Sequence, residues 1–211
     1  MKEGFVYHHS EQDYLMLALW IPESVCTLPA SASHQVGIGA LVMNTENRLL
    51  VVQEVTGPTK GSGTWKMPTG VVLQREDIQD AAVREVKEET GVDAKFVEVF
   101  GVRQSHGVAF GKSDLFFVCL LQPLSSDIVI QKHEIAAAQW MPFDDYRSQE
   151  ANTKSELLTR IADIVTAAFQ GKYTGFGVEK LRLSPRSKRA ACFHHNTRDI
   201  DRYLKDGKRS S

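Results

Sequence analysis

Three glutamates carry the clearest chemical signal in this sequence. Glu85, Glu88 and Glu89 lie at positions i, i+3 and i+4 of a segment with helical periodicity, so their carboxylates share one helix face. They fall in the last turns of that helix, where the helix dipole and their mutual repulsion both oppose negative charge. A divalent cation relieves that cost, and Mg²⁺ or Mn²⁺ prefers carboxylate, carbonyl and water oxygens. The spacing therefore indicates a metal site.

The alternative explanation is a solvated acidic face, which is the commoner origin of a run of charges. Three observations weaken it. Ile78, Ala81 and Ala82, one turn earlier on the same face, have the character of packed residues. The nearby cation, Lys87, points to roughly the opposite side of the helix at 100° per residue. A loop that contains glycine, residues 65–70, also runs directly into this unit.

The segment from Gly70 to Val92 resembles the Nudix box. That signature is Gly, five residues of any kind, Glu, seven of any kind, then Arg-Glu-apolar-any-Glu-Glu-any-Gly-apolar. The matching residues are Gly70, Glu76, Arg84, Glu85, Val86, Glu88, Glu89, Gly91 and Val92. Because every required position matches, this signal is far more specific than a lone glycine motif. The resemblance implies an α/β fold, a Nudix α/β/α sandwich with a mixed sheet and a loop–helix–loop catalytic motif.

The same resemblance implies roles for these residues in hydrolysing a nucleoside diphosphate linked to another group. The implied metal ligands are Glu85, Glu88, Glu89 and the carbonyl of Gly70, with Mg²⁺ or Mn²⁺ as cofactor. The resemblance also implies that Glu76 and Arg84 form a salt bridge that holds the loop. The three glutamates are also the catalytic residues, and Glu85 or a later glutamate is the base toward the attacking water. Metal ions neutralise the pyrophosphate charge, lower the pKa of bound water and align the leaving group.

Further segments resemble one subgroup, the plant cytosolic Nudix hydrolases that act on ADP-ribose and NADH. This subgroup is related to the animal protein encoded antisense to a fibroblast growth factor. The segments are residues 8–9, 32–37, 51–54, 65–70, 112–117 and 134–141. The resemblance implies cleavage of ADP-ribose to AMP and ribose 5-phosphate, and of NADH to AMP and reduced nicotinamide mononucleotide. It also suggests a homodimer.

Two departures keep other substrates open. Residues 103–110 lack the Ser-Gln-Pro-Trp-Pro-Phe-Pro-type array of general NADH pyrophosphatases, and Gly107 stands where bacterial-type ADP-ribose pyrophosphatases have proline. The alternatives are coenzyme A, an RNA cap or an isoprenoid diphosphate. A nonhydrolysing nucleotide-binding protein is the alternative from another class, and the intact glutamates argue against it.

Residues outside the box supply candidate substrate contacts. Arg103, Gln104 and His106 are placed to contact phosphate or ribose, and Lys66 to attract anions. Glu134 either approaches the metal from a second element or is a surface acid. Phe116 and Phe117 are expected in the core, because adjacent strand residues face opposite sides.

The glutamates need a sheet and helices to position them. The pattern predicts a buried strand over residues 14–21, and a hairpin of strands 36–43 and 49–52 around a turn at 44–47. A loop at 56–64 precedes the helix, which is predicted over 78–90 and ends at Gly91. Strands follow at 96–103, 115–121 and 136–141, and an amphipathic helix is predicted around 157–168.

Composition limits the possible class of protein. The chain has 211 residues, 25 Lys and Arg, 26 Asp and Glu, and 42% hydrophobic residues, as in a soluble domain of ordinary size. The near-neutral charge argues against a protein that coats nucleic acid. Residues 14–21, an apolar stretch near the start, fall well short of the ~20 residues that span a bilayer. No signal peptide is recognised and the three cysteines are widely spaced, so a cytoplasmic protein is expected.

The charge is not evenly distributed. From residue 179 onward, ten Lys and Arg face four Asp and Glu, which indicates a solvated basic tail. We therefore expect residues 1–33 to be the remnant of an N-terminal region with a lead-in strand. Residues 34–175 form the predicted hydrolase domain, and residues 176–211 the basic, partly disordered tail.

Overall fold

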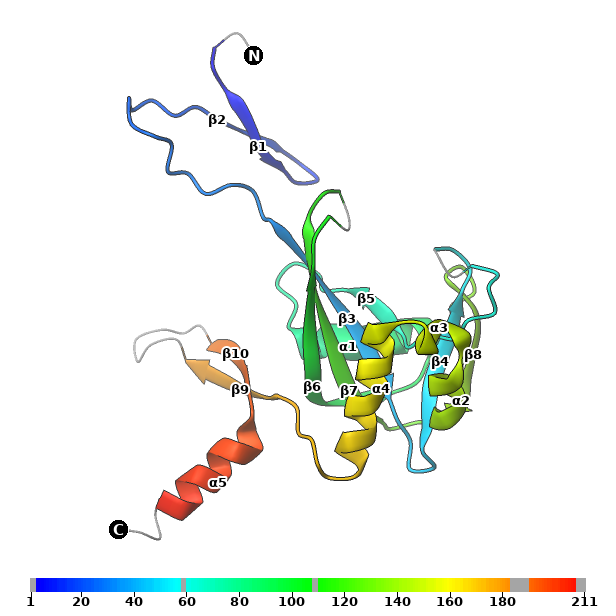
Figure 1. The fold of residues 1–211 in the computed structure, drawn as a ribbon. Helices are drawn as coiled ribbons and strands as arrows, with labels where there is room; N and C mark the ends of the chain where they lie inside the picture. Colours follow the sequence, from blue (N-terminus) through cyan, green and yellow to red (C-terminus); the bar gives the residue numbers. More distant parts are fainter. Residues whose placement is uncertain (1–2, 58–59, 108–109, 183–189, 208–211) are drawn as a thin grey trace.

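The computed structural model describes residues 3–57, 60–107, 110–182 and 190–207 (Figure 1). Its centre is a four-stranded mixed sheet in the order β5-β3-β7-β6. The strands are β3 (His34–Val42), β5 (Thr69–Val71), β6 (Ala94–Ser105) and β7 (Ser113–Pro123). Strand β3 runs parallel to β7 and antiparallel to β5, while β6 is antiparallel to β7. A second antiparallel sheet pairs β4 (Arg48–Glu54) with β8 (Ile135–Pro142).

Helices cover both faces of the sheet, which gives the three layers expected of the α/β class. Helix α1 (Ile78–Thr90) packs on one face through a core that includes Ile38 and Val86. Helix α4 (Glu156–Phe169) packs on the other face, in a core that includes Leu41 and Val165. Neighbours in β3 face different layers because side chains alternate along a strand. Short helices α2 (Phe143–Ser148) and α3 (Glu150–Thr153) connect β8 to α4.

Helix α1 begins and ends where the sequence predicts. Asp77 occupies the N-cap position, although its side chain makes no capping hydrogen bond. Gly91 ends the helix with φ 72°, and its amide donates to the Lys87 carbonyl at 2.9 Å. This left-handed conformation is the reason that glycine is favoured there. In the described part of the chain, none of the helices is long and apolar enough to cross a membrane.

The predicted hairpin of strands 36–43 and 49–52 is wrong. An isolated bridge between Met43 and Leu49 and a hydrogen bond from the Asn44 amide to the Arg48 carbonyl at 3.0 Å join the two strands at the turn, and each strand has its main partners elsewhere. Strand β3 is bonded on both edges by β5 and β7, whereas β4 pairs with β8. A strand that is buried on both faces gains most from partners on both edges, and sequence proximity did not reveal those partners.

The predicted buried strand over residues 14–21 is also wrong in its burial. The structure has a shorter strand, β2 (Leu15–Ala18), paired with β1 (Val6–Ser10) in a hairpin that projects from the body (Figure 1). Leu15 is 56% exposed. An apolar run is buried only where another layer covers it, and among the described residues no layer packs over this ribbon.

The region after residue 176 contains more regular structure than the expected tail. It forms β9 (Gly177–Arg182), β10 (Ala190–His195) and α5 (Thr197–Gly207). Phe176 bridges to Val99 at the edge of β6, and Lys180 lies 3.5 Å from Asp77 before α1. Five of the predicted tail cations lie outside the described residues: Arg186, Lys188, Arg189, Lys208 and Arg209.

Candidate active site

The three glutamates of α1 differ sharply in exposure. The Glu88 side chain is 52% exposed and that of Glu85 is 14% exposed. Glu89, one turn further along the buried side, is only 4% exposed. The shared face predicted from the spacing therefore runs from solvent at Glu88 into the protein at Glu89.

Gly70 brings the backbone of β5 directly against Glu85. A Cβ atom at position 70 would lie 1.9 Å from Cδ of Glu85. Only a residue without a side chain permits this approach, because real Cβ atoms do not come within 3.0 Å of such neighbours. The glycine that opens the box thus holds the main chain and the carboxylate together in space.

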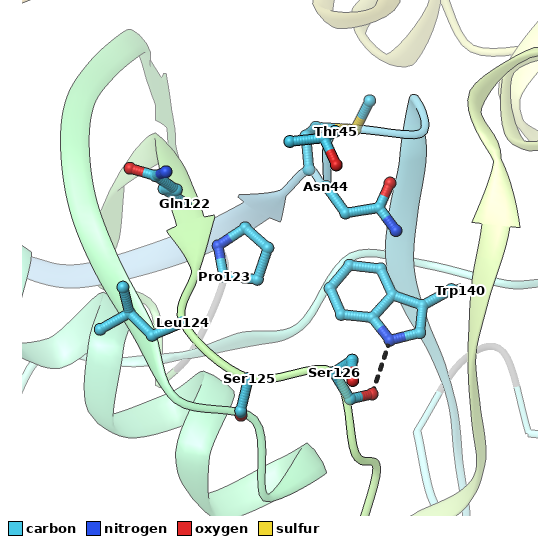
Figure 2. A pocket seen from close by; sticks show the side chains of 9 residues that line it. Asn44, Thr45, Gln122, Pro123, Leu124, Ser125, Ser126 and Trp140 are labelled. Carbon is cyan, nitrogen blue, oxygen red and sulfur yellow. Dashed lines mark hydrogen bonds between the residues drawn. The ribbon is translucent and has the colours of Figure 1, made fainter.

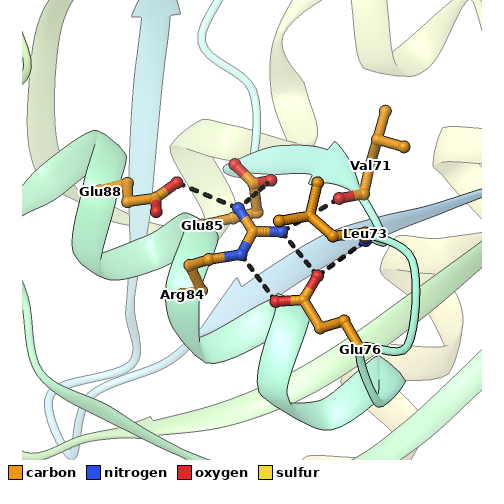
Figure 3. A network of polar contacts seen from close by, with 6 residues as sticks. All are labelled: Val71, Leu73, Glu76, Arg84, Glu85 and Glu88. Carbon is orange, nitrogen blue, oxygen red and sulfur yellow. Dashed lines mark hydrogen bonds and ion pairs between the residues drawn. The ribbon is translucent and has the colours of Figure 1, made fainter. Parts of the chain in front are cut away.

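Arg84 connects the loop before α1 with two of the glutamates (Figure 3). Its Nε donates to Oε1 of Glu76 at 2.7 Å, and its Nη2 donates to Oε2 of Glu76 at 2.9 Å and to the Val71 carbonyl at 3.0 Å. Its Nη1 donates to Glu85 at 2.7 Å and to Glu88 at 3.0 Å. Arg84 also holds the pKa of Glu76 below its usual value. One guanidinium therefore fixes the loop to the helix.

Glu89 lies in the most unfavourable position for a charge. Its Oε2 is buried and has no hydrogen-bond partner among the described residues. Burial raises the pKa of Glu89 to about 8, opposed by Lys66 and assisted by repulsion from Glu85 and Glu54. Burial likewise raises the pKa of Glu85, against the lowering effect of Arg84.

Lys66 and Glu54 form an ion pair beside Glu89. The Lys66 ammonium contacts the Glu54 carboxylate and donates to Oγ1 of Thr69 at 2.9 Å. The predicted anion-attracting lysine is thus already paired within the protein. Glu54 was not predicted as a site residue; its position at the end of a buried strand, shortly before the glycine loop, was the available signal.

The donor set fits a divalent cation. Carboxylates and a backbone carbonyl are the hard oxygen ligands that Mg²⁺ and Mn²⁺ prefer, and Oε2 of Glu89 is buried without a hydrogen-bond partner among the described residues. Among the described residues, no three His, Cys, Asp or Glu side chains are already arranged as a metal cluster. One oxygen each of Glu85 and Glu88 accepts a hydrogen bond from Arg84.

The other predicted contacts lie further along the sheet. Arg103 pairs with Asp114, and its guanidinium carbon lies 4.8 Å from the centre of the Phe116 ring. The Gln104 amide nitrogen lies 2.9 Å from Nε2 of His34. Among the described residues, no hydrogen bond or ion pair joins these groups to the glutamates of α1. Glu134, by contrast, is close enough for its charge to raise the pKa of Glu85, although it is the weakest of the causes.

A separate hollow lies at the far end of β3 and β7 (Figure 2). It has a volume of about 340 Å³ and is lined by Met43, Asn44, Thr45, Gln122, Pro123, Leu124, Ser125, Ser126 and Trp140. The indole Nε1 of Trp140 donates to the Ser126 carbonyl at 2.9 Å, which fixes the ring. None of the predicted site residues lines this hollow.

Sequence comparison identifies the family. The NUDIX domain model matches residues 33–161. The chain is 54% identical over 200 residues to Nudix hydrolase 2 of Arabidopsis thaliana, covering 95% of this chain and 71% of that protein. It is 39% identical over 170 residues to the human protein Nucleoside diphosphate-linked moiety X motif 6, covering 79% of this chain. The chain spans 52% of that human protein, and 54% of Arabidopsis Nudix hydrolase 8.

Solved structures share the fold at low sequence identity. A MutT NUDIX hydrolase from Burkholderia pseudomallei has a TM-score of 0.52 and 22% identity, covering 64% of this chain and 99% of that one. The NUDIX domain of Shewanella oneidensis NrtR, complexed with ADP ribose, has a TM-score of 0.53 and 14% identity, covering 65% of this chain and 90% of that one. The resemblance read from the box is confirmed, and the chain belongs to the Nudix hydrolase family.

Proposed function

We propose that this protein hydrolyses the pyrophosphate of a nucleoside diphosphate linked to another group, with ADP-ribose, NADH or both as substrates and AMP as a product. The observation that carries the proposal is that Gly70, the first residue of the box, lies against Glu85, whose charge acts on the buried Glu89 near the end of the box. The high identity to Arabidopsis Nudix hydrolase 2 supports the chemistry. The subgroup resemblance supports the choice of substrate.

Nudix hydrolases generally use divalent metal ions, and we propose Mg²⁺ or Mn²⁺ here. The ion would be held by Glu85, Glu88, Glu89 and the Gly70 carbonyl, and when bound it supplies charge neutralisation and a more acidic water. Glu85 and Glu89, whose pKa values burial raises in the metal-free protein, are the proposed candidates for the base toward the attacking water. Arg103, Gln104 and Lys66 are the proposed contacts for the substrate phosphates and ribose.

The proposal is tested by AMP release from ADP-ribose, NADH and coenzyme A with Mg²⁺ and with Mn²⁺. Glu85→Gln and Glu89→Gln are expected to abolish turnover without unfolding the chain. Glu150→Gln is the matched control, because this exposed glutamate lies at the start of α3 and its ion pair is with Lys154. Wild-type rates in Glu85→Gln would overturn the site, whereas turnover of coenzyme A alone would overturn the substrate assignment.

We further propose a cytoplasmic homodimer, which follows from the subgroup resemblance. Light scattering during size-exclusion chromatography measures the mass of the particle against the 23.6 kDa chain. A single species of one chain mass across the micromolar range would refute the dimer.

A further inference from the structure

Gln149 occupies the corner between two short helices. It follows α2 and precedes α3, with φ −56° and ψ 140°. Its backbone carbonyl accepts from the amides of Asn152 at 2.9 Å and Thr153 at 3.0 Å. The buried Asn152 donates from Nδ2 to the Tyr146 carbonyl at 2.6 Å, which ties the two helices together. The Gln149 side chain therefore projects from a well-fixed position.

The side-chain amide of Gln149 forms hydrogen bonds with both the backbone amide and the backbone carbonyl of Trp65. The Trp65 amide donates to Oε1 of Gln149 at 2.8 Å, and Nε2 of Gln149 donates to the Trp65 carbonyl at 3.1 Å. The pair repeats what a neighbouring strand would supply, with one donor and one acceptor facing each other. Nε2 also donates to the Tyr146 carbonyl at 3.2 Å, which fixes the orientation of the amide.

The next residue is held from another element. The Lys66 amide donates to the Val52 carbonyl at 3.0 Å, and the Val52 amide donates to the Lys66 carbonyl at 2.8 Å. Residue 65 is thus bonded to the helical corner and residue 66 to strand β4. Together these contacts fix the end of the loop that joins β4 to β5. The Lys66 side chain extends from this fixed backbone into the active site.

The position of Lys66 matters because of what its ammonium contacts. It pairs with Glu54, donates to Thr69 and is the main favourable charge near the buried Glu89. A displacement of this ammonium by about 1 Å would change the electrostatic environment of a catalytic carboxylate, and shifts of that size reduce rates strongly.

We infer that Gln149 is a positioning residue for catalysis, acting through Trp65 to hold Lys66 beside Glu89. It does not contact substrate or the reacting atoms. Its effect on turnover rests on the proposed function, whereas its hold on Trp65 does not. The corner of α2 and α3 thereby becomes part of the catalytic apparatus, although it lies outside the Nudix box.

The test compares Gln149→Met with Asn152→Ala. The first removes both bonds to Trp65 and retains a long side chain, while the second weakens the same corner and leaves those bonds in place. Hydrogen exchange at the Trp65 amide is measured by NMR, and kcat is measured for AMP release from ADP-ribose and NADH. A double-mutant cycle adds Gln149→Met to Lys66→Met, because coupled residues give non-additive effects.

We expect Gln149→Met to speed exchange at the Trp65 amide by about tenfold and to lower kcat by about three- to tenfold. On the Lys66→Met background it should change kcat by less than about twofold. Unchanged exchange at Trp65, or an undiminished effect on that background, would overturn the inference. So would an equal loss of kcat in Asn152→Ala. A wild-type chain that cleaves neither substrate would refute the proposed function, and the exchange measurement would still decide whether Gln149 holds Trp65.

Discussion

Replacing Glu89 by glutamine should stabilise the metal-free protein at neutral pH while abolishing its activity. Glu89 is 4% exposed, and one of its oxygens is buried without a hydrogen-bond partner among the described residues. Burial raises its pKa from 4.5 to about 8, so the folded state binds a proton that the unfolded state releases. For a raised carboxyl pKa, stability is fully present below pH 4.5 and is lost as the pH rises toward 8. Glutamine removes this loss.

The magnitude follows from the same shift. Each pKa unit corresponds to about 1.4 kcal/mol, so the wild type loses up to about 3 kcal/mol between pH 5 and pH 7.5 that Glu89→Gln retains. The nitrogen of the new amide group is buried, and a buried donor left unpaired costs about 1–3 kcal/mol at both pH values. At pH 5 the variant is therefore expected to be about as stable as wild type or less stable. At pH 7.5 the stability difference between variant and wild type should shift by about 1–3 kcal/mol in favour of the variant.

Urea unfolding in EDTA, followed at pH 5 and pH 7.5, measures this difference. Glu88→Gln is the matched control, because Glu88 is 52% exposed and its ion pair with Arg84 contributes little. Saturating Mg²⁺ should then stabilise the wild type but not Glu89→Gln, since a ligand stabilises only the form that binds it. If the stability difference between Glu89→Gln and wild type were the same at both pH values, the burial argument would be refuted.

Two glycines give further predictions. Gly70→Ala should lower kcat by about two orders of magnitude, because the new methyl group displaces the carboxylate of Glu85. The melting temperature should change little, since the flexible end of that side chain gives way; a large loss of stability would contradict this. Gly175→Ala should cost about 1–3 kcal/mol in urea unfolding, because its Cβ would lie 2.2 Å from the rigid Val99 carbonyl. Gly101→Ala in β6 is the control, as its Cβ has open space; equal costs would show that the clash is not the cause.

The elements with a strong local signal were predictable from sequence. The helix over 78–90 has a periodic apolar face and a glycine at its end, and both signals act within a few residues. The strand Phe96 to Arg103 and the helix around 157–168 were likewise recognised, and the structure only extends their ends. Local propensity and side-chain alternation are enough when an element is long and regular.

Pairing between strands was not predictable in this way. The distance between β3 and β4 along the chain suggested a hairpin, but β4 pairs with β8, which lies far away in the sequence. The apolar run at 14–21 illustrates the same limit for burial, because hydrophobic residues become core only if another layer covers them. Such choices depend on tertiary packing, which one sequence does not display.

The site shows a similar division. The spacing of Glu85, Glu88 and Glu89 predicted a common face, but it could not predict that one carboxylate would be buried and another exposed. Lys66 was singled out as a cation without its partner Glu54, because an ion pair across two loop ends leaves no trace in local sequence. The contribution of Gln149 was invisible for the same reason.

Arg84 explains how three carboxylates are tolerated at the wrong end of a helix dipole. It hydrogen-bonds Glu85 and Glu88 directly, so two of the three charges are compensated within the chain. Both carboxylate oxygens of Glu76 also accept hydrogen bonds from Arg84, and these bonds do not depend on the other two glutamates. If Glu85 and Glu88 turn toward a cation, Arg84 keeps its partner and the loop stays attached to α1. Arg84 donates no hydrogen bond to Glu89, and Oε2 of Glu89 has no partner among the described residues, so the burial of Glu89 is the structural feature that most specifically favours a bound cation.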